Sequence, residues 1–390
     1  MNLFVANQQL MNVSAVTSYT VQAISQFLVL IEDDEDDIIR REKTVLQQRC
    51  VWTRFVLLNK NRPLFARHLR MSHGSFMALL DQIMAGFPSI DDKMAAKRGG
   101  LIIPELRLYL TLRYIAGGAY SDICFFCGIS VSSFYRCLWA TIDAINNSIA
   151  VKFPTTAEEC ALHASSFQSV SHRGIISNCV GAVDGYLLAI NTPAKKHAKN
   201  VRSYFSGHYQ RYGVNIQACC DAHLRFTFLG IGGPGVMKDR DAVRESGLLD
   251  LINNLPLGYV VIGDCAYQPS EHLVPIFGAE LALLKDNDNF NFFASQLRIR
   301  IEMAFGMMTR KWGILQRPLS IALPQVKHLI CCIARLHNFC IDEQLKKPSR
   351  QRRPVAINTR STLSPHQLAY MHASAQVSLL QCIFKLFNIY

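Results

Sequence analysis

Hydrophobic residues recur at helical intervals from Phe65 to Ile149, and glycines break that pattern into separate segments. The stretch from Pro104 to Ile145 reads as a helix, a break at Gly117–Gly118, a short helix, a turn at Gly128 and a longer helix. Either Ser130 or Ser132 is placed to cap that longer helix. The pattern predicts a helix-turn-helix arrangement.

The last helix of such an arrangement can lie in the major groove of DNA. Here it carries a single basic residue in its first two turns, Arg136, among several apolar side chains. The sequence therefore leaves two interpretations open, DNA reading and plain helical packing.

After a predicted loop near residues 152–172, the pattern changes from helical spacing to short runs of apolar and β-branched residues. We expect strands at 179–190, 212–221, 224–231 and 259–263, a short fifth candidate at 282–285, and helices at 240–255, 294–312 and 323–343. Three strands followed by alternating helices and strands predict an α/β domain, in which helices cover a mixed sheet.

These patterns divide the chain into four predicted parts. They are a flexible N-terminal segment at 1–60 with an acidic cluster at 32–37, a helical domain at 61–152, an α/β domain at 173–343 and a basic, polar tail at 344–390. The acidic cluster lacks the spacing and the glycine of a calcium-binding loop, so we interpret it as a solvated charge run.

Composition points to a polyanionic partner. The net charge of the 390-residue chain is +12, which favours nucleic acid first and a membrane surface second. Thirteen cysteines without framework spacing, and no basic signal segment at the start, favour reduced thiols inside a cell. Cys124 and Cys127 form a C-x-x-C without a second pair, which favours core packing over a zinc site. No apolar run reaches the length of about 20 residues that spans a bilayer.

Two aspartates follow apolar runs that read as buried strands. Asp184 follows VGAV and Asp264 follows YVVIG. Strand ends are where α/β sheets build sites, and a buried carboxylate needs a partner, a metal or solvent. Two such aspartates on neighbouring strands would repel each other unless a cation lay between them.

A third carboxylate, Glu302, lies beside the apolar stripe of the helix predicted at 294–312. Arg298 lies one turn earlier, so an exposed i,i+4 ion pair is the simpler interpretation. The alternative is a helix-borne metal ligand that faces Asp184 and Asp264. Three carboxylates make an oxygen-rich site suited to Mg²⁺ or Mn²⁺, and two such ions about 4 Å apart can cleave a phosphodiester.

Six stretches, in order, resemble the PIF/Harbinger superfamily of DDE transposases and their domesticated nuclease relatives. They are GAVDGYLLAI (181–190), YFSGHYQRYGVNIQACCD (204–221), GPGVMKDRDAVRESGLL (233–249), VVIGDCAYQPSEHLVPIF (260–277), RIRIEMAFGMMTRKWGIL (298–315) and LHNFCI (336–341). The chain departs from the family pattern at Ala266, where a glycine is common, and at Lys238, where histidine or asparagine is common.

The resemblance implies an RNase H-like catalytic domain with a two-metal Asp–Asp–Glu site. By position in the motifs, the first aspartate is Asp184, the second is Asp264 and the glutamate is Glu302. It also implies Mg²⁺ or Mn²⁺ as cofactor, cleavage and strand transfer at transposon ends, and a Myb-like DNA-binding partner protein. We further expect a nuclear location, with the cytoplasm as a second location, and a homo-oligomer.

Basic residues near these motifs are candidates for DNA contact. They are Lys195, Lys196, Lys199, Arg202 and Arg211 in one loop, where Tyr204, Phe205 and Tyr209 are interleaved, and Arg298, Arg300 and Lys311 around Glu302. The basic stretch KKPSRQRRP at 346–354 has the composition of a nuclear import signal. Two alternatives stay open: a domesticated factor that binds DNA or protein without cutting, and a nuclease that acts on RNA.

Overall fold

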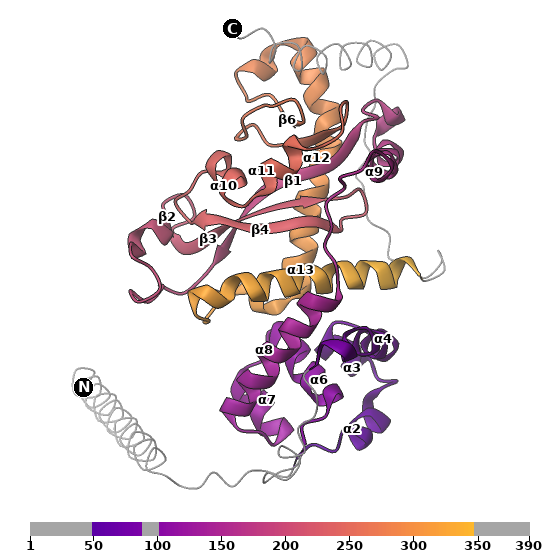
Figure 1. Cartoon of the computed structure of the whole chain (residues 1–390), viewed down its shortest axis with the longest axis vertical. Helices are drawn as coiled ribbons and strands as arrows, with labels where there is room; N and C mark the ends of the chain where they lie inside the picture. The colour runs from indigo at the N-terminus through magenta and orange to yellow at the C-terminus, as the bar shows by residue number, and fades with distance from the viewer. Residues whose placement is uncertain (1–48, 88–100, 347–390) are drawn as a thin grey trace, which may run out of the picture. The chain divides into compact units, whose positions relative to one another are not determined.

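The computed structural model of the chain describes residues 49–87 and 101–346 (Figure 1). The acidic cluster at 32–37 and all but the first residue of the basic stretch at 346–354 lie outside these ranges. The first helices are α2 (Trp52–Asn59), α3 (Pro63–Leu69), α4 (His73–Ile83), α6 (Pro104–Ile115), α7 (Tyr120–Cys127), α8 (Val131–Ser148) and α9 (Ala157–Val170). The helix α2 begins before the boundary at which we expected the helical region to start.

A mixed sheet with helices on both of its faces follows. Its elements are β1 (Cys179–Ala189), β2 (Phe205–Ser206), β3 (Arg211–Cys220), β4 (Phe226–Pro234), α10 (Asp239–Glu245), α11 (Leu248–Asn253), β5 (Val260–Gly263), β6 (Leu273–Pro275), α12 (Lys285–Lys311) and α13 (Leu323–Leu345). β1 pairs antiparallel with β3 and parallel with β5. β4 extends the sheet antiparallel from β3, and β6 extends it parallel from β5. The α/β architecture of RNase H-like type that we predicted from the sequence is confirmed.

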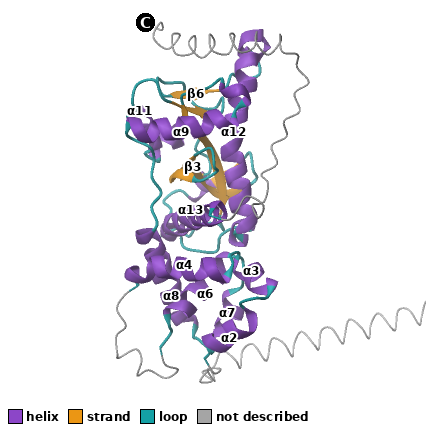
Figure 2. Ribbon diagram, turned by 90° about the vertical axis from the view of Figure 1, so that its right-hand side faces the viewer, coloured by secondary structure: helices purple, strands orange, loops and turns teal. Residues whose placement is uncertain are grey.

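The alternation of side chains along the strands divides the core into two layers. Ala182 and Ile262 belong to a large apolar cluster shared with α12 and α13. Val183 and Val261 belong to a second cluster, with apolar residues of α9, α10 and α11. α12 therefore covers one face of the sheet, along which it runs in Figure 2, and α10 and α11 cover the other.

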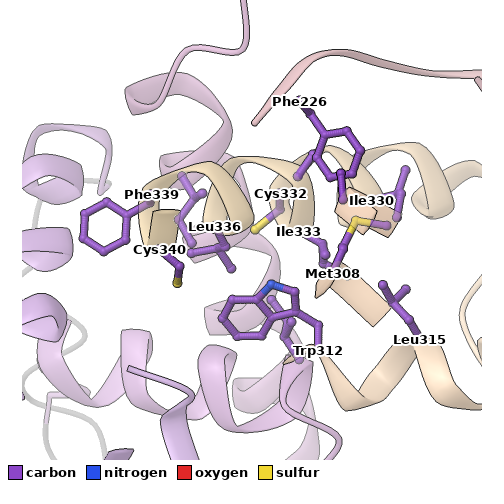
Figure 3. Close-up of a cluster of buried hydrophobic side chains, with 14 of the residues drawn as sticks. Phe226, Met308, Trp312, Leu315, Ile330, Cys332, Ile333, Leu336, Phe339 and Cys340 are labelled. Atoms are coloured by element: carbon purple, nitrogen blue, oxygen red, sulfur yellow. The ribbon is translucent and has the colours of Figure 1, made fainter. Parts of the chain in front are cut away.

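Three long elements meet at the centre of the larger cluster. Figure 3 shows Trp312, at the end of α12, among side chains of α13, with Phe226 of β4 beside them. Trp312 is fully buried, as are Ile330 and Ile333. The apolar spacing predicted for the helix at 323–343 is therefore the face of α13 that packs on α12 and β4.

The helix-turn-helix geometry is confirmed. α7 and α8 meet at 102° across a short turn in which Gly128 has a φ of +63°, a left-handed conformation that glycine adopts without strain. The Ser130 hydroxyl accepts a hydrogen bond from the Ser133 N–H at 3.3 Å, so Ser130 is the capping residue. Cys124 and Cys127 are both buried, as the core-packing interpretation requires.

Most of α8 is occupied by packing against other helices. It contacts α4, α6 and α13, and the Arg335 Nε of α13 donates to the Ile149 carbonyl at the end of α8 at 2.8 Å. Val131, Ser132 and Arg136 remain exposed in its first two turns. Any contact with a DNA groove is therefore limited to the N-terminal end of α8.

Three predictions of local structure were wrong. The predicted loop near 152–172 contains α9, which begins with a capping box between Thr156 and Glu159. The candidate strand at 282–285 is a 3₁₀ turn at Leu281–Leu283 followed by the start of α12, and the edge strand is β6 instead. The helix expected at 240–255 is broken into α10 and α11 at Gly247, whose φ is +83°.

No single helix in the described ranges is long and apolar enough to cross a membrane; the bent pair of α7 and α8 has the required length and composition only when both helices are counted together. None of the cysteines in the described ranges forms a disulfide bond.

Asn338 ties α13 to β4, and we expect it to be important for stability. Its amide donates to the Phe226 carbonyl and accepts from the Phe226 N–H, both at 2.8 Å, and only 8% of the residue is exposed. Asn338→Ala leaves two buried backbone groups unpaired, so we expect a loss of about 2–3 kcal/mol in the free energy of unfolding. Urea denaturation measures this loss, with the exposed Asn147→Ala in α8 as control. Equal unfolding free energies for the two variants would contradict the assignment.

Candidate active site

Asp184 and Asp264 lie at the same level of two neighbouring parallel strands. The pairing of β1 with β5 ends at Ala182 and Ile262, and each aspartate follows two residues later. We expected Asp184 to end its strand, but β1 continues to Ala189 because it stays paired with β3, where Asp184 lies opposite Ala218. Asp184 therefore lies inside β1 but after Ala182, the last residue of β1 that pairs with β5. At Asp184, the edge of β1 that faces β5 has no paired strand.

Both aspartates share the face of the sheet that α12 covers. Asp184 lies two residues after Ala182, and Asp264 lies two residues after Ile262, so each aspartate shares the face of its apolar predecessor. Both Ala182 and Ile262 pack on the α12 side. Tyr186, two residues after Asp184, stacks on Phe305 of α12 with ring centroids 5.2 Å apart. Since Phe305 is one turn after Glu302, α12 brings the third predicted carboxylate to this face.

The backbone orients the two aspartates in the same way. One carboxylate oxygen of Asp184 accepts from the Gly185 N–H at 2.8 Å, and one of Asp264 accepts from the Cys265 N–H at 2.7 Å. In each case the N–H of the next residue holds one carboxylate oxygen, and the Cys265 thiol also forms a hydrogen bond with Asp264.

Burial is the main cause of an unusual protonation equilibrium at Asp184. It raises the pKa of the Asp184 carboxyl to about 7. The Gly185 N–H and the Arg298 guanidinium oppose this rise in pKa, whereas the carboxylates of Asp264 and Asp239 add to it. A cation between the strands would remove the repulsion from Asp264.

Glu302 is paired with Arg298. One guanidinium nitrogen lies 2.5 Å from the Glu302 carboxylate, and 46% of the glutamate side chain is exposed. The surface ion pair considered from the sequence is therefore formed. Within residues 49–87 and 101–346, no three histidine, cysteine, aspartate or glutamate side chains are grouped so that they could hold a metal. The fold brings two of the predicted ligands together and leaves the third on Arg298.

The chemistry of these donors nevertheless fits a hard divalent cation. Asp184 and Asp264 offer carboxylate oxygens, which Mg²⁺ and Mn²⁺ prefer. Glu302 shares Arg298 with the site, because the same guanidinium that pairs with Glu302 also acts on the pKa of Asp184. A bound cation would take over the charge balance that Arg298 provides for both carboxylates.

A polar network lies on the opposite face of the sheet, directly behind the two aspartates. Asp239, in the first turn of α10, accepts from the side-chain amides of Asn215 and Gln217 of β3 at 3.0 and 2.9 Å. The Tyr267 hydroxyl donates to the Gln217 side-chain carbonyl at 2.7 Å. The sequence patterns did not indicate Gln217 or Tyr267 as residues near the candidate site.

Asp221 forms a turn. One of its oxygens accepts from the N–H groups of His223 and Arg225 at 2.8 and 2.9 Å, and the other forms an ion pair of 2.7 Å with Arg225. These bonds close the tight turn between β3 and β4 and leave Asp221 buried and paired, without a role at the candidate site.

The loop between β1 and β3 presents its basic residues to solvent. Its five candidates for DNA contact, Lys195, Lys196, Lys199, Arg202 and Arg211, are all exposed. Among the interleaved aromatic residues, Tyr209 and Phe205 are 52% and 37% exposed, whereas Tyr204 packs against the core. The Val236 N–H donates to the Ser203 carbonyl at 3.0 Å, which joins this loop to the segment leading to Asp239.

The three basic residues predicted around Glu302 differ in their surroundings. Arg298 pairs with Glu302, and its side chain is 20% exposed. Arg300 is only 4% exposed, so it is not placed on the surface where DNA would bind. The Lys311 ammonium lies 5.8 Å from the centre of the Trp312 ring and also interacts with Cys340 of α13. Neither Arg300 nor Lys311 is presented beside the two aspartates.

Comparison with known proteins finds one family model and one curated relative that are similar to part of this chain. Residues 183–338 match the family model described as DDE superfamily endonuclease. A curated Arabidopsis thaliana protein, Protein ALP1-like, is 22% identical over 299 residues, which are 71% of this chain and 70% of that protein. No solved structure matches the chain. These findings confirm the resemblance to DDE transposases of Harbinger type that the six motifs carry.

The high pKa of Asp184 predicts how pH changes the stability of the metal-free protein. Because the folded-state pKa, about 7, lies above the ordinary value of 3.8, the contribution to stability is complete below about pH 4 and is lost as pH rises through 7. Asp184→Asn imitates the protonated form and keeps this contribution. In a chelator we expect the variant to be about 2–4 kcal/mol more stable than wild type at pH 8 and equal to it near pH 4.

Urea denaturation at several pH values checks this expectation. Asp143→Asn, the same change at an exposed position of α8, is the matched control and should follow the wild-type curve. Parallel curves for wild type and Asp184→Asn would show that Asp184 titrates normally.

Proposed function

We propose that the protein is a divalent-metal-dependent nuclease of Harbinger transposase type that cuts DNA phosphodiester bonds, because residues 183–338 match the family model described as DDE superfamily endonuclease. One observation supports the proposed activity most directly: Asp184 and Asp264 lie at the same level of two neighbouring strands, on the face of the sheet that α12 covers. Two aligned carboxylates on the face covered by α12, the helix that carries Glu302, are suited to holding Mg²⁺ or Mn²⁺.

In this proposal each carboxylate has a defined task. Asp184, fixed inside a paired strand, is the rigid ligand, and Asp264, in the turn after β5, is the second. Glu302 completes the set after it leaves Arg298. The metal would supply Lewis-acid activation of a water or a 3′-hydroxyl and stabilise the leaving oxygen.

Arg298 gains a role in the same step. If Glu302 held a metal, the Arg298 guanidinium, which also acts on Asp184, would be released from its ion pair and would be available to pair with a phosphate of the DNA. The exposed basic loop with Tyr209 and Phe205 is suited to hold the backbone and bases of the same DNA. A DNA substrate is also why we keep the nucleus as the proposed location.

A second candidate function is a domesticated factor that binds DNA or protein without cutting. The Arg298–Glu302 ion pair favours it, because a glutamate held by an arginine does not contribute to a metal site. In that case Asp184 and Asp264 would remain without a chemical task.

Nicking of supercoiled DNA in Mn²⁺ distinguishes the two functions. We expect nicking by the wild-type protein and a loss of at least about 100-fold in rate for Asp264→Asn, which keeps the shape of the side chain but removes the charge that binds the metal. Asp250→Asn, at an exposed position of α11, is the control and should nick at the wild-type rate.

Equal nicking by wild type and Asp264→Asn would contradict the proposed site. Binding of DNA by both proteins without cutting by either would favour the binding factor. A matched single-stranded RNA substrate, cut faster than DNA, would transfer the proposed activity to RNA.

A further inference from the structure

The space directly behind the two candidate metal ligands is kept open by glycines. Gly185 follows Asp184, and Gly263 precedes Asp264, so each glycine faces the side of the sheet opposite to its aspartate. A Cβ at Gly185 would lie 2.1 Å from a carboxylate oxygen of Asp239. A Cβ at Gly263 would lie 2.9 Å from the Tyr267 ring. Asp239 and Tyr267 therefore occupy the space that ordinary side chains would fill behind both aspartates.

Gln217 connects these two residues. It lies opposite Gly185 in the pairing of β1 with β3 and is fully buried. Its side-chain NH₂ donates to Asp239 at 2.9 Å and to Asn215 at 2.8 Å, and its carbonyl accepts from the Tyr267 hydroxyl at 2.7 Å. Each hydrogen-bonding group of this buried amide has a partner, which fixes both its orientation and theirs.

Tyr267 carries the connection to Asp264. Its backbone N–H donates to the Asp264 carbonyl at 3.1 Å, which closes the turn that holds Asp264 after β5. The ring is 3% exposed and packs with the apolar cluster on the α10 and α11 side. The turn that presents Asp264 is thus anchored through one hydroxyl to the strand beside Asp184.

We propose that Gln217 is a positioning residue of the active site. By holding Tyr267 and Asp239 behind the sheet, it fixes the Asp264 turn relative to β1 and so sets the spacing of Asp184 and Asp264. This inference rests on the proposed metal-dependent function. Gln217 itself contacts no substrate, because the sheet separates it from the face of α12.

The alternative is that the network only stabilises the fold. A purely structural role would change the melting temperature but would leave metal affinity unchanged in protein that is still folded. A positioning role changes the affinity for metal at a temperature where wild type and variant are both folded, since outer residues that orient ligands are typically worth about 10- to 100-fold in metal affinity.

The test is a titration of the full-length chain with Mn²⁺ in the absence of DNA. Electron paramagnetic resonance measures the concentration of the free ion at each step. Tyr267→Phe removes only the hydroxyl, and Gln217→Met keeps a similar volume without polar groups. Tyr259→Phe removes a hydroxyl from a residue beside the same apolar cluster but outside the network, and is the matched control. Circular dichroism at the titration temperature verifies that each protein is folded.

We expect the dissociation constant for Mn²⁺ to rise about 10- to 100-fold in Tyr267→Phe and in Gln217→Met, and to stay at the wild-type value in Tyr259→Phe. Wild-type affinity in both network variants would overturn the positioning role and leave the proposed nuclease intact. Both proposals would be overturned if wild type bound no Mn²⁺, or bound Mn²⁺ only in a way that Asp264→Asn leaves unchanged.

Discussion

The parallel pairing of β1 with β5 is the constraint on which the candidate site depends. It ends at Ala182 and Ile262, while the antiparallel pairing of β1 with β3 continues past it. The two parallel strands are in register at this point, and the next residue on the same face is an aspartate in both of them. The sheet therefore presents two carboxylates at one level, with hydrogen-bonding of the main chain supplying the rigidity.

The cost of that arrangement is the repulsion of two partly buried negative charges. The structure offsets it in two ways. Burial raises the pKa of the Asp184 carboxyl to about 7, so the group is partly protonated near neutral pH, and Arg298 supplies a positive charge from α12. In the proposed function both solutions are reversible, since a divalent cation would compete with the proton at Asp184 and with the Arg298 guanidinium for Glu302. The ion pair that occupies Glu302 and the metal site proposed here are thus alternative ways to balance the same charges.

Much of the fold could be predicted because its signals are local. Runs of β-branched residues gave β1, β3, β4 and β5, and glycines with a capping serine gave the turn between α7 and α8. The edge strand β6 and the helix α9 were missed, because three residues of strand and a polar amphipathic helix give weak patterns. The division of α10 from α11 depends on the left-handed backbone of Gly247, which the apolar spacing does not reveal.

The candidate site was predictable only in part, for the same physical reason. Asp184 and Asp264 could be found because each follows an apolar run, and six ordered motifs support their assignment. The burial of Arg300 could not be foreseen from a stretch of alternating basic and apolar residues. The network of Gln217, Tyr267 and Asp239 joins three elements far apart in the chain, so it exists only once β1 lies between β3 and β5.

The most direct test of this account is the position of Mn²⁺ in crystals of the protein, located by anomalous scattering. The account predicts anomalous density between the carboxylate oxygens of Asp184 and Asp264, with Glu302 turned away from Arg298 and toward the ion. Manganese bound elsewhere, or an empty space between the two aspartates with Glu302 still on Arg298 at saturating Mn²⁺, would contradict it.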